Sequence, residues 1–253
     1  MIYYAIGDVH GCHHHLVQML ENIERDRKLR EDSQIIFLGD YIDKGTESKA
    51  VLDLLFELRE APHIRFLVGN HDMMMSRILR MPAEEAAEES ISQWMQEGGR
   101  ETLISYNPDS ERLRRADYLP STSEIQEIVG DRHRTLIDSI AQPKNSHLFD
   151  TKDQALFAHA GIDPNKRLKD QTVDDFISAR NEDFLFAPSP TWTDSYSIVV
   201  FGHTAYNTPQ VMKPLDSFSP IRVGIDTGCY KSGCLTAAVI VEGQLERLIT
   251  VRR

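Results

Sequence analysis

The sequence has few cysteines and no long apolar run, and each shortage excludes a class of protein. Its three cysteines, Cys12, Cys229 and Cys234, are an odd number without zinc-knuckle spacing, so we expect no disulfide framework and a cytoplasmic location. No apolar stretch approaches the roughly 20 residues that span a bilayer. No basic leader precedes an apolar run at the start of the sequence. We therefore expect no association with a membrane.

The sequence also has fewer positively charged than negatively charged residues. The net charge is −11, which argues against nucleic acid as a partner, because general nucleic-acid binders present a basic face to phosphates. Phosphorylated substrates remain compatible, since bound metal ions can supply positive charge locally. Hydrophobic residues make up 41% of the 253 residues, which is enough for a sizeable core.

Short β-rich runs alternate with helical patterns in the first part of the chain. The expected strands are 2–6, 35–38 and 64–68, and helical patterns begin near His13, Glu47 and Met73. Such alternation predicts a layered α/β fold in which the loops gather at the carboxyl ends of the strands.

The rest of the chain changes character twice. Residues 82–140 predict a helical insert, with helices at 83–97 and 124–140 and a turn at 107–109. Beyond them, strands are expected at 155–158, 198–201, 221–225, 235–241 and 245–251, with a helix near 173–179. Because few helices separate these strands, we expect a second, more antiparallel sheet within a single domain, 1–253.

Residues that can bind metal ions follow five of the expected strands. They are Asp8, His10, Asp40, Asn70, His159 and His203. Taken singly, each is as well explained by turn chemistry or a loop histidine. Together, these carboxylate and amide oxygens and imidazoles predict a two-metal site for Mn, Fe or Zn, with Asp40 as the bridge.

The motifs and their order resemble the phosphoprotein phosphatase branch of the calcineurin-like metallophosphoesterases. The resembling segments are 7–11, 39–45, 69–72, 94–106, 159–161, 202–204 and 224–229. The resemblance implies a β-sandwich of two mixed sheets flanked by helices in αββα layers. It also implies a bacterial serine/threonine protein phosphatase, close to the dinucleoside tetraphosphate hydrolases.

The same resemblance implies a role for each site residue. One ion would be bound by Asp8, His10 and Asp40, and the other by Asp40, Asn70, His159 and His203. His71 would be the general acid, held by Asp43. Phosphate would be bound by Lys44, Asn70 and Arg180. A hydroxide held between the two ions would attack phosphorus in line.

Local alternatives accompany these roles. Asp43 could instead cap the helix near Glu47, and Arg180 could be a surface arginine. The histidines at 13–15 are expected to be solvated, and Cys12 to be a small packing residue. Three positions depart from the family pattern: Lys44 stands for arginine, Asp72 for glutamate and Ala160 for glycine.

The leading prediction is a metal-dependent phosphomonoesterase that acts on phosphoserine or phosphothreonine in proteins, and Asp43 is its best local support. The alternative is a symmetrical dinucleoside tetraphosphate hydrolase, so the substrate is a phosphoprotein or a small phosphate ester or nucleotide. A third possibility is a module that recognises phosphate without catalysis. A nuclease is disfavoured because Gly202-His203-Thr204-Ala205 lacks a second histidine.

Overall fold

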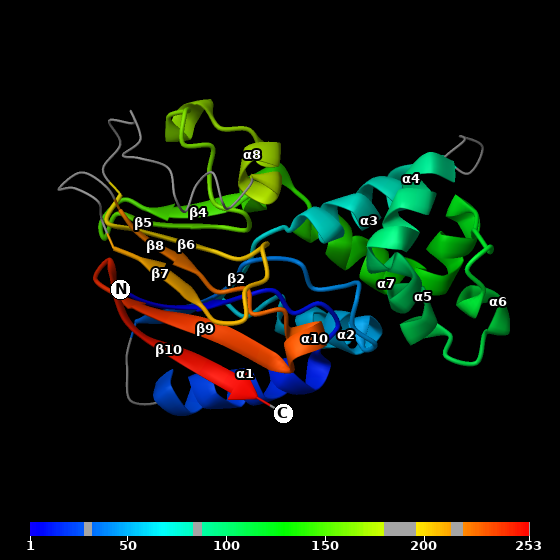
Figure 1. Cartoon of the computed structure of the whole chain (residues 1–253), viewed down its shortest axis with the longest axis horizontal. Helices are drawn as coiled ribbons and strands as arrows, with labels where there is room; N and C mark the ends of the chain where they lie inside the picture. The colour runs from blue at the N-terminus through cyan, green and yellow to red at the C-terminus, as the bar shows by residue number, and fades with distance from the viewer. Residues whose placement is uncertain (28–31, 83–87, 180–195, 214–219, 253) are drawn as a thin grey trace.

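Two five-stranded sheets lie face to face in the computed structural model, which describes residues 1–27, 32–82, 88–179, 196–213 and 220–252 (Figure 1). The first sheet has the order β10-β9-β1-β2-β3. Strands β1 (Ile2–Ile6), β2 (Ser33–Phe37) and β3 (Ile64–Phe66) are parallel, while β9 (Cys234–Val241) and β10 (Gln244–Arg252) join antiparallel beside β1.

The second sheet has the order β4-β5-β6-β8-β7. Its central strands β5 (Ala155–Ala158), β6 (Ile198–Phe201) and β8 (Ile221–Gly224) are parallel. Strands β4 (His147–Asp150) and β7 (Gln210–Met212) pair antiparallel at its two edges. Two mixed sheets are thus confirmed. The expectation that the C-terminal strands form a second, more antiparallel sheet was wrong in two respects: the central strands of that sheet are parallel, and the last two strands return to β1 in the first sheet.

Alternation of side chains along the strands produces two hydrophobic layers. In β1, Tyr3 and Ala5 face the second sheet, whereas Tyr4 and Ile6 face the helices. The ring centroids of Tyr3 and Phe157, which lie in different sheets, are 5.1 Å apart. The sandwich interior is therefore built from one face of each sheet.

Helices cover the outer faces of the sandwich. Helix α1 (His13–Arg27) packs against β9 and β10, and α2 (Ser48–Leu58) lies beside α1. On the second sheet, α8 (Val173–Ser178) places Phe176 against His147, with ring centroids 4.1 Å apart. Among the helices that the structure describes, none combines the length and apolar character needed to traverse a bilayer.

The remaining helices pack together beside the sandwich (Figure 1). They are α3 (Asn70–Arg80), α4 (Glu88–Trp94), a π-helical turn (Met95–Gly99), α5 (Arg100–Tyr106), α6 (Glu111–Arg114) and α7 (Thr122–Ile140). Short 3₁₀ turns follow at Pro143–Asn145 and Leu168–Asp170, and α10 (Cys229–Ser232) precedes β9. The expected helix at 124–140 and the turn at 107–109 are confirmed. The expected helix at 83–97 is observed from Glu88 onward.

Candidate active site

Loops from both sheets converge at one edge of the sandwich. The loops after β1 and β2 belong to the first sheet, and those after β5 and β6 to the second. For these loops to converge, the backbone of one loop must pass close to a side chain of another. A Cβ atom on Gly202 would lie 1.9 Å from Oδ1 of Asp8, and one on Gly69 would lie 2.1 Å from Oδ1 of Asp40. Both glycines are therefore required by space.

Asp40 lies at the centre of the site. Its Oδ2 atom is 3.4 Å from Nε2 of His10 and 3.4 Å from Nε2 of His159. Its Oδ1 atom accepts a hydrogen bond of 3.0 Å from the backbone N–H of His71. Two triplets of donor atoms share Asp40, one with His10 and His71, the other with His159 and His203. The atoms of each triplet lie within 4.8 Å of one another.

Asn70 joins the second triplet. Its Oδ1 atom is 3.0 Å from Nε2 of His159 and 2.9 Å from Nδ1 of His203. The two imidazole nitrogens are themselves 3.2 Å apart. Three atoms that can each bind a metal ion thus point at one another, which is the arrangement expected where a cation binds.

The histidines are oriented by hydrogen bonds on their other nitrogens. Nδ1 of His10 is 2.7 Å from the carbonyl oxygen of Ile42, and Nδ1 of His159 is 3.1 Å from that of Leu38. When these Nδ1 atoms carry the proton, both Nε2 lone pairs face Asp40. Such support from a carbonyl is typical of metal-binding histidines.

Asp8 lies against the second sheet rather than within either triplet. Its carboxylate accepts hydrogen bonds of 3.1 and 3.0 Å from the backbone N–H of His203. Burial and the negative charge of Asp226 raise the pKa of Asp8 well above its usual value. Asp226, which follows β8, is a buried member of the site; the 224–229 motif contains it, but no role was predicted for it.

His71 and Asp43 form a buried pair. Nδ1 of His71 is 2.7 Å from Oδ2 of Asp43, and that oxygen also accepts a 3.0 Å bond from the indole N–H of Trp94. Oδ1 of Asp43 accepts a 2.7 Å bond from Thr102. Asp43 is therefore not the helix cap that the alternative required; the cap position of α2 is Glu47. Trp94 and Thr102 lie in the 94–106 motif, but their hydrogen bonds to Asp43 were not predicted from the sequence.

The pKa values reflect a strongly negative site. Although burial opposes protonation, the charges of Asp40 and Asp8 raise the pKa of His159 to about 9. Burial is likewise outweighed at His71, whose pKa is raised by Asp40 and Asp43. At His10, by contrast, burial lowers the pKa to about 3. Protons and cations are thus attracted to the same place.

Asp72 links the loops after β2 and β3 through hydrogen bonds to their backbone. Its Oδ2 atom accepts bonds of 2.8 Å from the N–H of Asp40 and 2.9 Å from that of Gly69, while Oδ1 accepts a 3.1 Å bond from Tyr41. Burial and the charge of Asp40 raise its pKa to about 7. The aspartate that replaces the family's glutamate therefore still positions the central ligand.

Lys44 and Tyr230 lie at the mouth of the site. The ammonium of Lys44 is 3.0 Å from Nε2 of His10 and 5.5 Å from the ring centroid of Tyr230. A cation bound through Nε2 of His10 would displace this ammonium, leaving it available to a phosphate. Tyr230 is 39% exposed, and its ring packs edge-on to His10 with the centroids 5.6 Å apart.

The donor set fits metal ions on electrostatic grounds. Several aspartates in and around the site are almost completely buried: Asp8, Asp40, Asp43, Asp72 and Asp226. Buried charges are stable only when they are compensated. Divalent ions held by carboxylates, an amide and imidazoles would provide that compensation, and this mixed set suits Mn, Fe or Zn.

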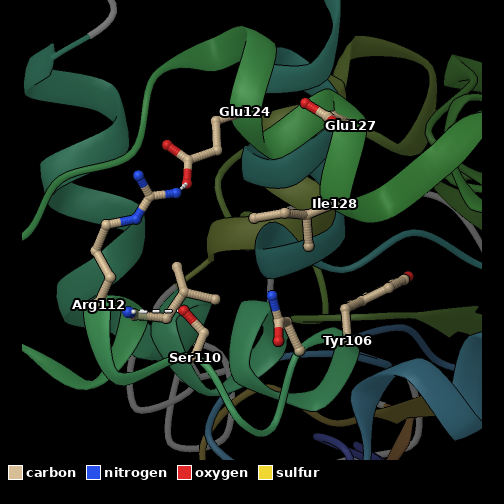
Figure 2. Close-up of a pocket in the computed structure, with 8 residues that line it drawn as sticks. Tyr106, Ser110, Arg112, Glu124, Glu127 and Ile128 are labelled. Atoms are coloured by element: carbon tan, nitrogen blue, oxygen red, sulfur yellow. Dashed lines mark hydrogen bonds and ion pairs between the residues drawn. The ribbon is translucent and has the colours of Figure 1, made fainter.

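A pocket lies among the helices, away from the candidate metal ligands. It has a volume of about 360 Å³ and is lined by residues of α5, α6 and α7 and the segments that connect them (Figure 2). Arg112 forms an ion pair with Glu124, and Glu127 adds another negative charge to the lining. This pocket is therefore poorly suited to a phosphate.

The histidines at 13–15 and Arg180 were also singled out in the sequence. His15 is buried, so the expectation that the three histidines at 13–15 are solvated was wrong for His15; His14 is exposed. Arg180, predicted to bind phosphate, lies outside the described residues.

Comparisons with known proteins agree with this geometry. The family model described as calcineurin-like phosphoesterase matches residues 1–207. The symmetrical bis(5'-nucleosyl)-tetraphosphatase of Nitrosomonas europaea is 24% identical, with all of both chains covered. The asymmetrical bis(5'-nucleosyl)-tetraphosphatase PrpE of Anoxybacillus flavithermus is also 24% identical, over 94% of this chain and 89% of its own.

Solved structures show the same fold. A protein proposed to be a diadenosine tetraphosphatase superimposes with a TM-score of 0.60 at 19% identity, over 99% of this chain and 92% of its own. A serine/threonine phosphatase from Saccharomyces cerevisiae gives 0.51 at 13% identity, over 100% and 80%. The chain therefore belongs to the calcineurin-like phosphoesterase family, and it is a hydrolase that acts on phosphate esters.

Proposed function

We propose that this enzyme is a metal-dependent hydrolase of dinucleoside tetraphosphates and that cleavage is symmetrical. The observation that carries the proposal is full-length similarity to proteins named bis(5'-nucleosyl)-tetraphosphatase. Symmetrical and asymmetrical relatives match at the same identity. The proposal of symmetrical cleavage is therefore tested separately from the choice of substrate.

The site residues divide into two groups of ligands around Asp40. Asp8, His10 and Asp40 would hold one ion, and Asp40, Asn70, His159 and His203 the other. The first triplet contains His71 in place of Asp8, whereas the second lies within the proposed set and Asn70 contacts both of its histidines. Bound ions of this kind place positive charge on a phosphate and lower the pKa of water.

His71 is assigned the proton transfer to the leaving oxygen rather than a place in the ligand set. Its Nε2 atom is 3.9 Å from Oδ2 of Asp40, so the distance alone permits either role. The carboxylate of Asp43 on Nδ1 favours the charged imidazolium, which cannot bind a metal but can donate a proton. Asp43 therefore acts through His71, as a positioning residue.

The exposed ring of Tyr230 supports a nucleotide substrate. A phosphate over Lys44 would lie beside this ring, because ring and ammonium are in contact range. An exposed aromatic face next to a phosphate site can stack a nucleobase. Tyr230 is thus the residue we assign to base binding.

A serine/threonine phosphatase remains the second candidate, and the Asp43–His71 pair favours it. The alkoxide that leaves from phosphoserine is a strong base and needs a proton, whereas a nucleoside diphosphate is a much better leaving group. A well-supported proton donor is therefore worth more to a phosphomonoesterase than to an anhydride hydrolase.

The deciding experiment compares two substrates. Purified protein with Mn²⁺ is assayed for kcat/KM on diadenosine tetraphosphate and on a phosphoserine peptide, with product analysis by chromatography. We expect the nucleotide to be preferred and to yield ADP as the product. ATP plus AMP would overturn symmetrical cleavage, and preference for the peptide would establish the second candidate.

A further inference from the structure

A cluster of sulfur and imidazole lies directly behind the candidate active site. The side-chain donor atoms of Cys12, His15 and Cys229 all lie within 4.8 Å of one another, and all three residues are buried. No motif spacing connects them, because Cys229 is more than 200 residues from the other two. The fold alone creates this cluster.

The local structure explains why these side chains meet. The carbonyl of Cys12 accepts the first hydrogen bond of α1, from the N–H of Leu16 at 3.1 Å. Cys12 and His15, three residues apart, therefore lie on the same face of the first turn. Cys229 is the first residue of α10, which lies beside the start of α1 (Figure 1).

We propose that Cys12, His15 and Cys229 bind a thiophilic divalent cation of the Zn²⁺ class, at a site separate from the catalytic ligands. Two thiols with one imidazole are a donor set that favours soft or borderline ions, and the two sulfur atoms distinguish it from the catalytic site, whose oxygen and imidazole donors suit Mn, Fe or Zn. On binding, each thiol releases its proton to solvent, and the two thiolates balance the charge of the ion.

The geometry is close to what such an ion needs. Zinc–sulfur bonds of about 2.3 Å place tetrahedral sulfur ligands about 3.8 Å apart. Donor atoms that already lie within 4.8 Å of one another need to close by ~1 Å at most to reach this spacing. Three protein ligands leave the fourth position for water.

The site would connect two catalytic loops. Sγ of Cys12 is 3.7 Å from the carbonyl oxygen of His10, and Cys229 follows the loop that carries Asp226. An ion between α1 and α10 would hold both loops together. Without one, the hydrogen bond between Cys12 and Cys229 and burial raise the pKa of the Cys229 thiol, so this thiol stays protonated.

The test uses Co²⁺ titrated into the reduced, full-length protein. Thiolate ligands give Co²⁺ an intense near-ultraviolet charge-transfer band that oxygen and nitrogen ligands do not produce, so the catalytic site is silent. We expect the band to reach the amplitude of one thiolate-bound Co²⁺ per chain, while Co²⁺ taken up by the catalytic site adds nothing to it. Cys12→Ser and Cys229→Ser should abolish it, and His15→Gln should weaken Co²⁺ binding at least tenfold.

Cys234→Ser is the matched control, because Cys234 is buried nearby but lies outside the triplet. Its band should equal that of the wild type. If the other variants fail to fold by circular dichroism, alkylation of the wild type mapped by mass spectrometry replaces them: Cd²⁺ should protect Cys12 and Cys229 but not Cys234. Absence of the band in the wild type, its survival in Cys229→Ser, or a Cys12–Cys229 disulfide in place of bound metal would overturn the proposal.

Discussion

Two polar regions of this molecule contain similar side chains but differ in how their charges are balanced. In the pocket between α5, α6 and α7, Arg112 is paired with Glu124 (Figure 2). Glu124 also accepts a hydrogen bond from Tyr118. At the strand ends, Asp8, Asp40 and Asp226 are buried together, and the nearby ammonium of Lys44 contacts His10.

The comparison shows that a cluster of charged residues becomes a candidate ion site when its charge is buried and uncompensated. In the helical pocket, Glu124 already neutralises Arg112, so the pocket offers little positive charge to a phosphate. The strand-end site raises the pKa values of Asp8 and His159 because negative charge accumulates there. Variants in the two regions should therefore have very different effects.

The largest effect is expected at Asp40. Asp40→Asn keeps the shape of the side chain but removes the charge shared by both triplets, so kcat should fall by about a thousandfold or more, which is ~4 kcal/mol of barrier. Turnover of diadenosine tetraphosphate with Mn²⁺ measures it, with circular dichroism as the control for folding. A rate within tenfold of the wild type would contradict the central position of Asp40.

His71→Asn should lower the rate on a phosphoserine peptide by roughly 10²–10⁴-fold, the usual contribution of a general acid. The loss on diadenosine tetraphosphate should be smaller, because its leaving group needs less protonation. Comparing kcat for both substrates tests the assignment. Equal losses on both would point to His71 as a metal ligand, since a ligand acts on every substrate.

Thr102→Val probes the support of Asp43. The change removes the hydroxyl that bonds Oδ1 of Asp43 at 2.7 Å while keeping a similar volume. We expect a loss of about 1–3 kcal/mol in the free energy of unfolding, because buried groups lose a partner. Chemical denaturation measures it, and Thr102→Ser, which keeps the hydroxyl, serves as the comparison. No loss beyond that of the comparison variant would contradict the support role.

Tyr230→Ala should raise KM for diadenosine tetraphosphate about five- to tenfold, in line with ~1 kcal/mol or slightly more for stacking one base. KM for a phosphopeptide should change little. Tyr230→Phe is the matched control and should behave like the wild type. An unchanged KM for the nucleotide in Tyr230→Ala would remove Tyr230 from base binding.

The smallest effect is expected in the helical pocket. Arg112→Ala breaks the exposed ion pair with Glu124 and should change kcat/KM by less than twofold, with a stability loss of ~1 kcal/mol or less. The same nucleotide assay and a thermal melt measure both. A loss as large as that of Tyr230→Ala would place substrate in the pocket of Figure 2 and reverse the comparison of the two regions.

The candidate ligands were predictable because they follow strands. Asp8, His10 and Asp40 follow parallel strands of the first sheet, and His159 and His203 follow parallel strands of the second, so each set must gather at one edge of its own sheet. Local sequence patterns predict well which residues directly follow a strand.

What was missed depends on contacts between distant segments. Trp94 and Thr102 reach Asp43 across 51 and 59 residues, and no spacing rule announces those bonds. The return of β9 and β10 to β1 is equally non-local, since the sequence of a strand does not state its partner. His15 was misjudged for the same reason: the neighbour that helps bury it, Cys229, is far along the chain.

The central claim is that the strand-end donors bind two metal ions around Asp40. Its most direct test is the Mn²⁺ content of the purified protein, measured by inductively coupled plasma mass spectrometry after equilibration and buffer exchange. The account predicts two ions per chain in the wild type and fewer in Asp40→Asn, with both proteins folded. Retention of no Mn²⁺ by the wild type, or equal content in the two proteins, would contradict it.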